Sequence, residues 1–136
     1  MVNLIVGEKG TGKTKAMIDA VNKAVDDEHG NVVFIGYGSR HMFDLNHGAR
    51  LVDASAMGIS GYEMFEGFIQ GVISQNYDIT HIFIDSLFKI FDGELAELPA
   101  FINKIKEISA ANNIKFTITI SAAKDALPGE VSEYIA

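Results

Sequence analysis

GEKGTGKT, residues 7–14, fills every position of the phosphate-binding pattern GxxxxGK followed by Ser or Thr. It follows the apolar run Asn3 to Val6 directly, and it precedes a stretch in which Met17, Val21 and Ala24 recur at helical spacing. A glycine-rich loop between a strand and a helix lets backbone NH groups and the positive helix end surround a polyphosphate. This stretch therefore predicts a strand–loop–helix unit and a phosphate site within it.

The residue types of this loop suit that chemistry. Glycine at positions 7, 10 and 12 permits positive φ angles and close backbone approach to phosphate, which a side chain would obstruct. Lys13 is expected to reach the terminal phosphates, and the Thr14 hydroxyl is expected to ligate magnesium. The alternative is a glycine-rich turn that matches by chance. The predicted nucleotide-binding residues of the loop are Gly7, Glu8, Lys9, Gly10, Thr11, Gly12, Lys13 and Thr14.

Apolar runs of strand length alternate with stretches of helical period along the whole chain. The runs NVVFIG, THIFID and KFTITIS are rich in β-branched and aromatic residues, which predicts the centre of a sheet buried on both faces. Crossover helices are expected before Gly30, from Gly61 to Tyr77, and along the stripe Leu95 to Ile108, with its regular part beginning near Pro99. The predicted strands are Asn3 to Val6, Asn31 to Gly36, Arg50 to Asp53, Thr80 to Asp85 and Lys115 to Ser121.

This alternation predicts the fold class and the domain organisation. Strands that alternate with helices are typical of an α/β fold, so we expect a five-stranded, mainly parallel sheet with helices on both faces. A chain of 136 residues is the length of about one domain, and no linker or repeat divides it. One domain, residues 1–136, is therefore predicted.

A second motif lies at the end of the run HIFIDS, residues 81–86. Asp85 would stand at the sheet edge where the phosphate loop lies, and it can hold magnesium through a water there. Taken alone, an aspartate that caps the following helix is about as plausible. The phosphate loop upstream favours the metal. Ser86 stands where many hydrolysing proteins carry a general-base glutamate.

Composition and charge exclude several classes of protein. The chain is 48% hydrophobic and 21% charged, which excludes general disorder, and it has no cysteine, which excludes disulfides and thiolate metal sites. A net charge of −7 with only two arginines, Arg40 and Arg50, makes nucleic acid an unexpected partner. The sequence shows no signal peptide and no membrane span, so a soluble cytoplasmic protein is expected.

The two motifs together resemble the RecA-like branch of P-loop ATPases, in which a strand ending in Asp-Ser, here FIDSL, is familiar. KFTITIS resembles the neighbouring strand of that fold, and Ser121 matches its polar residue that senses the terminal phosphate. The resemblance implies a three-layer α/β/α P-loop NTPase fold that binds ATP and magnesium. NVVFIGYGSRHMFD, residues 31–44, resembles the segment in which relatives carry a catalytic glutamate, but Gly36, Tyr37 and Gly38 stand there.

A wider resemblance covers most of the chain. RLVDASAMGISGYEMFEGF and QNYDITHIFID are similar to segments of short bacterial P-loop proteins that are sometimes labelled twitching-motility ATPases. Motility ATPases are much larger, and neither their additional domain nor their acidic and histidine boxes are present here. The resemblance thus implies ATP binding and a fold, and it leaves the biological task open.

Several other side chains are weighed as contributors to a site. RecA-like proteins often complete the site with a basic residue of the adjacent subunit, and the candidates are Arg40, Arg50 and Lys124, each with a solvated surface group as the alternative. Glu8 is considered as a group that positions water. A loop metal site is weighed against a solvated loop, which the spacing favours, for His41, Asp44 and His47.

The segment after Asp85 is more apolar than one buried face of a short helix can use. We therefore consider a homo-oligomer or protein partner surface, with a helix buried on two sides as the equal alternative. The residues of this candidate surface are Leu87, Phe88 and Phe91.

The sequence leads to three functional hypotheses in a fixed order. The first is a slow ATPase that uses its nucleotide state to control a partner or its own assembly. The second is a nucleotide-gated binding module without useful hydrolysis, because both expected glutamate positions are empty. The third is a small-molecule kinase, ranked last because the residues after Ser121 leave little room for a lid.

Overall fold

The computed structural model describes residues 1–136 and contains one five-stranded sheet in which every neighbouring pair of strands is parallel. The strand order is β1-β5-β4-β2-β3. The three strands predicted to be central are therefore the central ones, and the sheet is wholly rather than mainly parallel. The strands are β1 (Val2–Gly7), β2 (Asn31–Gly36), β3 (Ala49–Asp53), β4 (Ile79–Ile84) and β5 (Lys115–Ser121).

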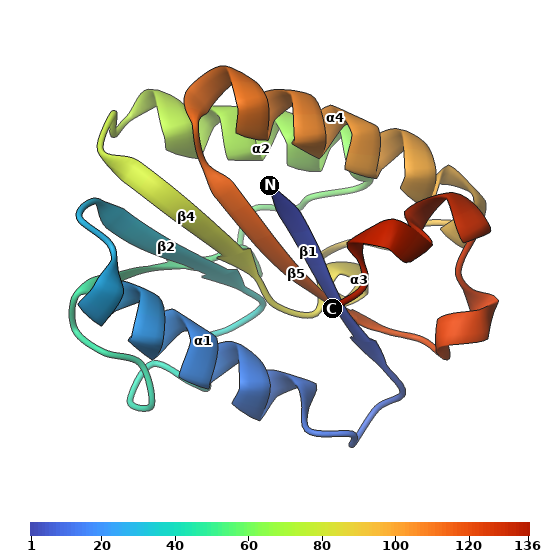
Figure 1. Ribbon diagram of the computed structural model, residues 1–136, viewed down its shortest axis with the longest axis horizontal. Coiled ribbons are helices and arrows are strands. Elements are labelled where there is room, and N and C mark those ends of the chain that lie inside the picture. The colour runs from blue at the N-terminus through green and yellow to red at the C-terminus, as the bar shows by residue number, and fades with distance from the viewer.

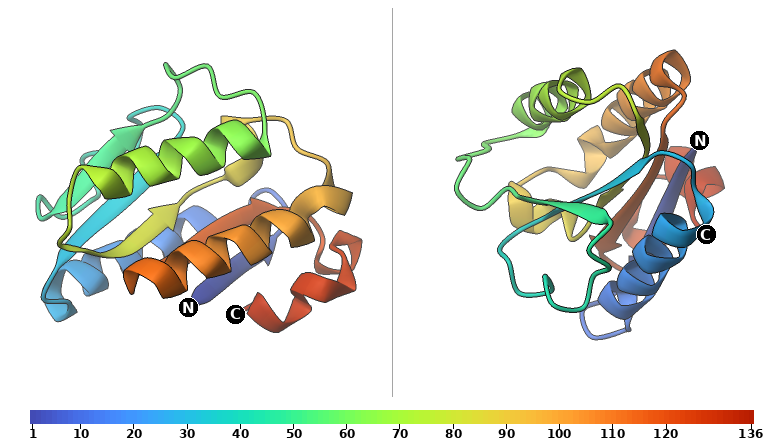
Figure 2. Two further views of the ribbon diagram at one scale, coloured as in Figure 1. Left: turned by 90° about the horizontal axis from the view of Figure 1, so that it is seen from above. Right: turned by 90° about the vertical axis from the view of Figure 1, so that its left-hand side faces the viewer.

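Helices cover both faces of this sheet, as the sequence predicts. Helix α1 lies on one face, and α2 and α4 lie side by side on the other (Figures 1 and 2). The regular part of α4 begins at Leu98, with Pro99 in its first turn, where a missing NH costs nothing. The helices are α1 (Lys13–Asp27), α2 (Tyr62–Ser74), α3 (Leu87–Ile90) and α4 (Leu98–Asn112), with 3₁₀ turns at Leu95–Glu97, Lys124–Ala126 and Gly129–Tyr134.

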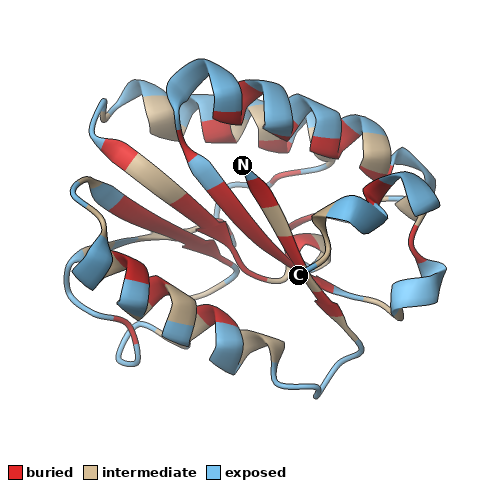
Figure 3. Ribbon diagram, in the orientation of Figure 1, coloured by how far each residue is buried: buried red, intermediate tan, exposed pale blue.

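Two apolar clusters hold these layers together. The larger one fills the space between the sheet and the pair α2 and α4, and Phe65, Phe101 and Phe116 are fully enclosed in it. The smaller one lies under α1, where Met17 and Val21 pack with Phe34 of β2. The buried residues run along the central strands and the inward faces of the helices (Figure 3). No helix is both long and apolar enough to span a bilayer.

Helix α3 is buried from several sides. Leu87 is 0% and Phe91 is 4% exposed, and the Phe91 ring centroid lies 4.9 Å from that of Tyr62 and 5.6 Å from that of Phe65. Only Phe88 remains partly exposed. The predicted partner surface is therefore wrong for Leu87 and Phe91, because these side chains stabilise the chain's own core.

The last ten residues pack against the outer edge of β1. Val131 is buried in the larger cluster, and Ile135 pairs with Leu4 in a parallel bridge. The amide of Ala136 then donates to the Leu4 carbonyl at 2.9 Å. This segment closes part of a strand edge and does not reach over the sheet as a lid.

The register of the strands brings three chain segments to one edge. Gly7 at the end of β1 pairs with Ser121 at the end of β5, and Ile84 of β4 pairs with Ile118 of β5. Because parallel strands end at the same edge, the phosphate loop, Ser121 and Asp85 meet at the carboxyl edge of the sheet. Strand β5 lies between the strand that leads into the loop and the strand that leads into Asp85.

The threonines of β5 alternate with its apolar residues and hold polar groups on the side of the sheet that faces α1. Thr117 contacts the ring of His81, with Oγ1 and Nε2 2.9 Å apart. Thr119 hydrogen-bonds Asp85 at the carboxyl edge. The side of β5 that faces α4 carries only apolar residues, which are Phe116, Ile118 and Ile120. A strand buried on both faces therefore tolerates hydroxyl groups because each one has a partner.

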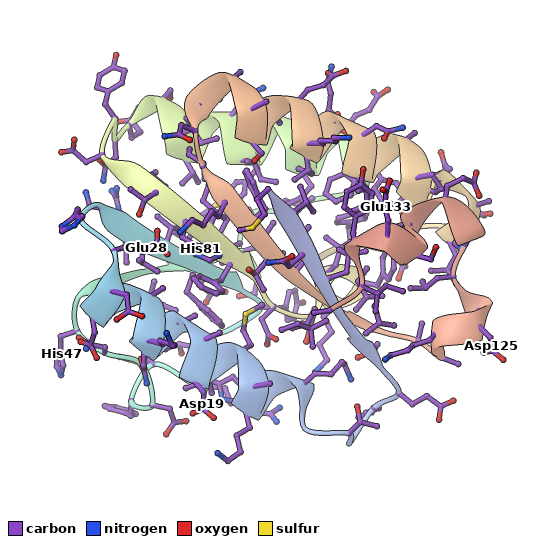
Figure 4. The ribbon with its side chains drawn as sticks, viewed as in Figure 1. Asp19, Glu28, His47, His81, Asp125 and Glu133 are labelled. Carbon is purple, nitrogen blue, oxygen red and sulfur yellow. The ribbon has the colours of Figure 1, made fainter.

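His81 is the centre of a polar cluster at the end of α1, far along the strand from the phosphate loop. Its Nδ1 lies 2.8 Å from Glu28 Oε2, and its ring stacks on Phe83 with centroids 3.9 Å apart (Figure 4). Burial lowers the pKa of His81, and the hydrogen bond and charge of Glu28 only partly offset this. Burial opposes ionisation of Glu28, yet His81 and the charge of Lys115 hold its pKa below the ordinary value.

Acidification is expected to destabilise the fold through this cluster. Unfolded His81 binds a proton near its ordinary pKa of 6.5, while folded His81 stays neutral to lower pH, so the free energy of unfolding falls as the pH falls through this window. The charges that face the ring are Glu28, Lys115 and the terminal ammonium of Met1. Urea unfolding between about pH 8 and about pH 5 measures the slope. His81→Gln, which does not titrate, should flatten it, and an unchanged slope in this variant would contradict the assignment.

Candidate functional site

The loop from Gly7 to Thr14 has the backbone that its glycines predict. Gly10 and Gly12 take φ angles of 86° and 84°, in the left-handed region where a side chain is strained. A Cβ atom on Gly7 would collide with the Thr11 hydroxyl. Helix α1 begins at Lys13 and has no side-chain cap on its first NH groups. The loop thus leaves backbone donors of the helix end free to bind an anion.

The Glu8 carbonyl is the internal anchor of this loop. It accepts hydrogen bonds from Thr11 Oγ1 at 2.7 Å and from Lys13 Nζ at 2.9 Å. The Lys13 ammonium is therefore folded back over the loop, within reach of any group that the loop encloses. The Glu8 side chain is exposed and lines neither cavity described below, so the structure does not bring its carboxylate into the site.

The largest opening beside this loop is a cavity of about 480 Å³, which we call the loop cavity. Phe88 is its one hydrophobic residue, and Ser121 lines it beside the loop, as the sequence predicts. No acidic residue lines it. The basic residues that line it are Lys9, Lys13, Lys15, Arg40 and Lys89. This concentration of positive charge occurs in a chain whose net charge is −7.

Most of these cations lack a counter-ion in the protein. Lys15 pairs with Asp19 across one turn of α1, at 3.3 Å. No ion pair involves Lys9, Lys13, Arg40 or Lys89. Like charges held close together without partners repel each other, so an anionic ligand that enters the cavity is strongly favoured.

A smaller cavity of about 50 Å³ adjoins the first, and we call it the Asp85 cavity. Thr14, Arg40, Ser86 and Lys89 line both cavities. Asp85 is the only carboxylate among its lining residues, and His41 lies on its wall. The structure therefore brings together Thr14 and Asp85, the two residues that the sequence predicts as metal ligands.

Asp85 is 7% exposed and is fixed by strand β5. Thr119 Oγ1 donates to Asp85 Oδ1 at 2.9 Å and accepts the Ser86 amide at 2.6 Å. Ser86 adopts a left-handed conformation, with φ 56°, which turns the chain sharply from β4 into α3. Asp85 Oδ2 keeps only a long contact of 3.5 Å to Ser86 Oγ. One carboxylate oxygen is thus held while the other remains available to a ligand.

This donor set fits a magnesium ion that is shared with a phosphate group. Magnesium takes hard oxygen ligands, and in phosphate sites it uses one or two protein oxygens together with water and phosphate oxygens. The Thr14 hydroxyl and the second oxygen of Asp85 supply such atoms in one cavity. No cluster of three or more His, Cys, Asp or Glu side chains is placed to hold a metal alone. His41 Nδ1 lies 3.8 Å from Asp44 Oδ2, and the pair recruits no third ligand.

The other basic candidates lie apart from the site. Arg50 lines a shallow groove with Val72 and Gln75 of α2, and Lys124 lies in the 3₁₀ turn after β5. Of the three basic candidates only Arg40 reaches the loop cavity. Sequence reasoning did not single out Lys89 or Thr119, although the alternation of threonine in KFTITIS is a signal that one face of this strand carries polar contacts.

In comparisons with known proteins, no family model and no curated protein matches this chain. Its function is therefore argued from the chemistry of the two cavities.

Proposed function

We propose that this chain is a P-loop NTPase of RecA-like type that binds ATP with magnesium and hydrolyses it slowly. The observation that carries the proposal is the loop cavity, in which an uncapped helix end and unpaired cations adjoin the Thr14 hydroxyl and Asp85. A triphosphate supplies the negative charge that this cavity lacks. The preference for ATP over GTP rests on the RecA-like resemblance.

The arrangement of the strands supports the same proposal. The strand that ends in Ser121 lies between the loop strand and the Asp85 strand, as the RecA-like resemblance leads one to expect. Helices on both faces of the sheet agree with a three-layer α/β/α sandwich (Figure 2). The magnesium ion would bridge phosphate oxygens and neutralise the charge that develops on them.

Slow turnover follows from the groups that the site lacks. Hydrolysis forms a bond from a water oxygen to the γ-phosphorus and breaks the bond from that phosphorus to the β–γ bridging oxygen. ADP and inorganic phosphate leave, and the proton of the water passes to phosphate or to solvent. Asp85 is the only carboxylate that lines either cavity, and Thr119 already holds one of its oxygens. No second carboxylate is positioned to orient the water or to take its proton.

The same observation favours a second candidate, a nucleotide-gated binding module. With no positioned base, bound ATP can act as a stabilising ligand whose presence or absence sets the state of the protein. In this case the control of a partner depends on nucleotide exchange and not on hydrolysis.

Phosphate release and thermal shift, recorded on the same samples with ATP or GTP, test the two candidates. With magnesium present, ATP is expected to raise the melting temperature and to be hydrolysed slowly. Chelation of magnesium should abolish turnover and reduce the shift, because a phosphate-bridging cation is lost. A thermal shift without turnover would select the binding module, and turnover that rises more than linearly with protein concentration would indicate a neighbouring subunit in the site. Absence of both signals would refute nucleotide binding.

A further inference from the structure

We propose that Arg40 and Lys89 bind the terminal phosphate of the nucleotide, so that a single chain distinguishes a nucleoside triphosphate from a diphosphate. This inference rests on the proposed function and adds the residues that would give the site its preference. Neither residue belongs to the phosphate loop. Arg40 follows β2, and Lys89 lies in α3, after the Asp85 strand.

Their position relative to the two cavities indicates which phosphate they reach. Both residues line the loop cavity and the Asp85 cavity, whereas Lys9, Lys13 and Lys15 line only the first. In a phosphate loop that is followed by a metal-binding hydroxyl, the metal lies between the last two phosphates of a triphosphate. Cations that share a wall with Thr14 and Asp85 are therefore placed at the end of the phosphate chain and not at its start.

The charge state of the two residues supports a ligand and not an internal role. Neither Arg40 nor Lys89 forms an ion pair, and both are exposed at the cavity. A guanidinium group presents a planar fork that matches two phosphate oxygens, and an ammonium group adds a compact point charge. Together they would supply positive charge that a triphosphate engages and a diphosphate, one phosphate shorter, does not.

The source of these cations is the same chain that carries the loop. No residue from a second subunit is needed to bring positive charge to the Asp85 cavity. Arg50 and Lys124, the other basic candidates, line neither cavity and serve as matched controls for the loss of one positive charge.

Calorimetric titration with magnesium adenylyl imidodiphosphate and with magnesium ADP tests the inference on the full chain. The wild type is expected to prefer the triphosphate analogue. Arg40→Ala and Lys89→Ala should each weaken binding of the analogue about tenfold, as expected for one charge-assisted hydrogen bond, and should leave ADP binding within about twofold. Arg50→Ala and Lys124→Ala should change neither affinity, and Arg40→Lys should recover part of the preference.

Two results would overturn the inference while nucleotide binding itself stands. In the first, the Arg40 and Lys89 variants bind both ligands like the wild type. In the second, they weaken both ligands equally, which indicates a general positive field and no contact to the terminal phosphate. Failure of the wild type to bind either ligand would instead refute the proposed function, and this inference with it. Circular dichroism of each variant establishes that the fold is intact, as expected for changes at exposed side chains.

Discussion

Replacement of Lys13 by alanine is expected to weaken the binding of magnesium ATP by about a hundredfold. The Lys13 ammonium donates to the Glu8 carbonyl at 2.9 Å in the empty loop and can turn to two phosphate oxygens. A hydrogen bond from a charged donor contributes about 1.5–3 kcal/mol, so the loss of two such bonds corresponds to at least about two orders of magnitude in affinity. Calorimetric titration of the variant measures this loss.

Lys23→Ala is the matched control for this prediction. Lys23 lies on the same helix, pairs with Asp27 at 2.8 Å and is largely exposed, away from the loop. It loses the same charge and the same side-chain length, so its affinity for ATP should stay near that of the wild type. Equal affinities of the Lys13 variant and the wild type would show that the loop is not the phosphate site.

Replacement of Thr119 by valine is expected to lower the free energy of unfolding by about 3 kcal/mol. The Thr119 hydroxyl donates to Asp85 Oδ1 and accepts the Ser86 amide, and valine fills the same space without either bond. Two polar groups then remain without these partners, and each such group costs about 1–3 kcal/mol when buried. Urea unfolding, followed by circular dichroism, measures the change.

Thr119→Ser and Thr117→Val separate this effect from simple loss of packing. Serine keeps the hydroxyl and loses one methyl group, so it should cost about 1 kcal/mol. Thr117→Val removes one contact, to His81, and leaves Asp85 untouched. If all three variants lose equal stability, the bridge from Thr119 to Asp85 and Ser86 has no special role.

Much of the fold could be predicted because the central strands are chemically uniform. NVVFIG and KFTITIS begin and end in the structure where their β-branched runs begin and end. The third run is displaced by one residue, to Ile79–Ile84, because the chain turns at Ser86 with a positive φ angle. Helix α2 ends at Ser74, before the predicted end at Tyr77, since Gln75 and Asn76 turn the chain toward β4.

The site could be predicted only where residue identity alone specifies a position. The phosphate loop, Asp85 and Ser121 meet at one sheet edge because each directly follows or ends a parallel strand. Arg40 and Lys89 reach the same cavity from a loop and from a one-turn helix, and no linear spacing indicates how such segments fold back. Their placement depends on the paths of the chain after β2 and β4.

The misplaced partner surface has a related cause. The apolar residues after Asp85 exceed what one face of a short helix can bury, which favoured exposure to a partner. In the structure α3 is a single turn whose surroundings include the rings of Tyr62, Phe65 and Phe101. A helix this short has no exposed face of its own, so most of its side chains enter the core.

A basic cavity in an acidic chain gives the protein fields of opposite sign at long and short range. At distances beyond about 10 Å, where salt screens individual charges, an approaching polyanion meets the net charge of −7 and is repelled. Only a ligand small enough to enter the cavity meets its cations before the surrounding carboxylates. The electrostatics therefore select by size as well as by charge, and admit a compact phosphate ester more readily than a long nucleic acid that carries the same groups.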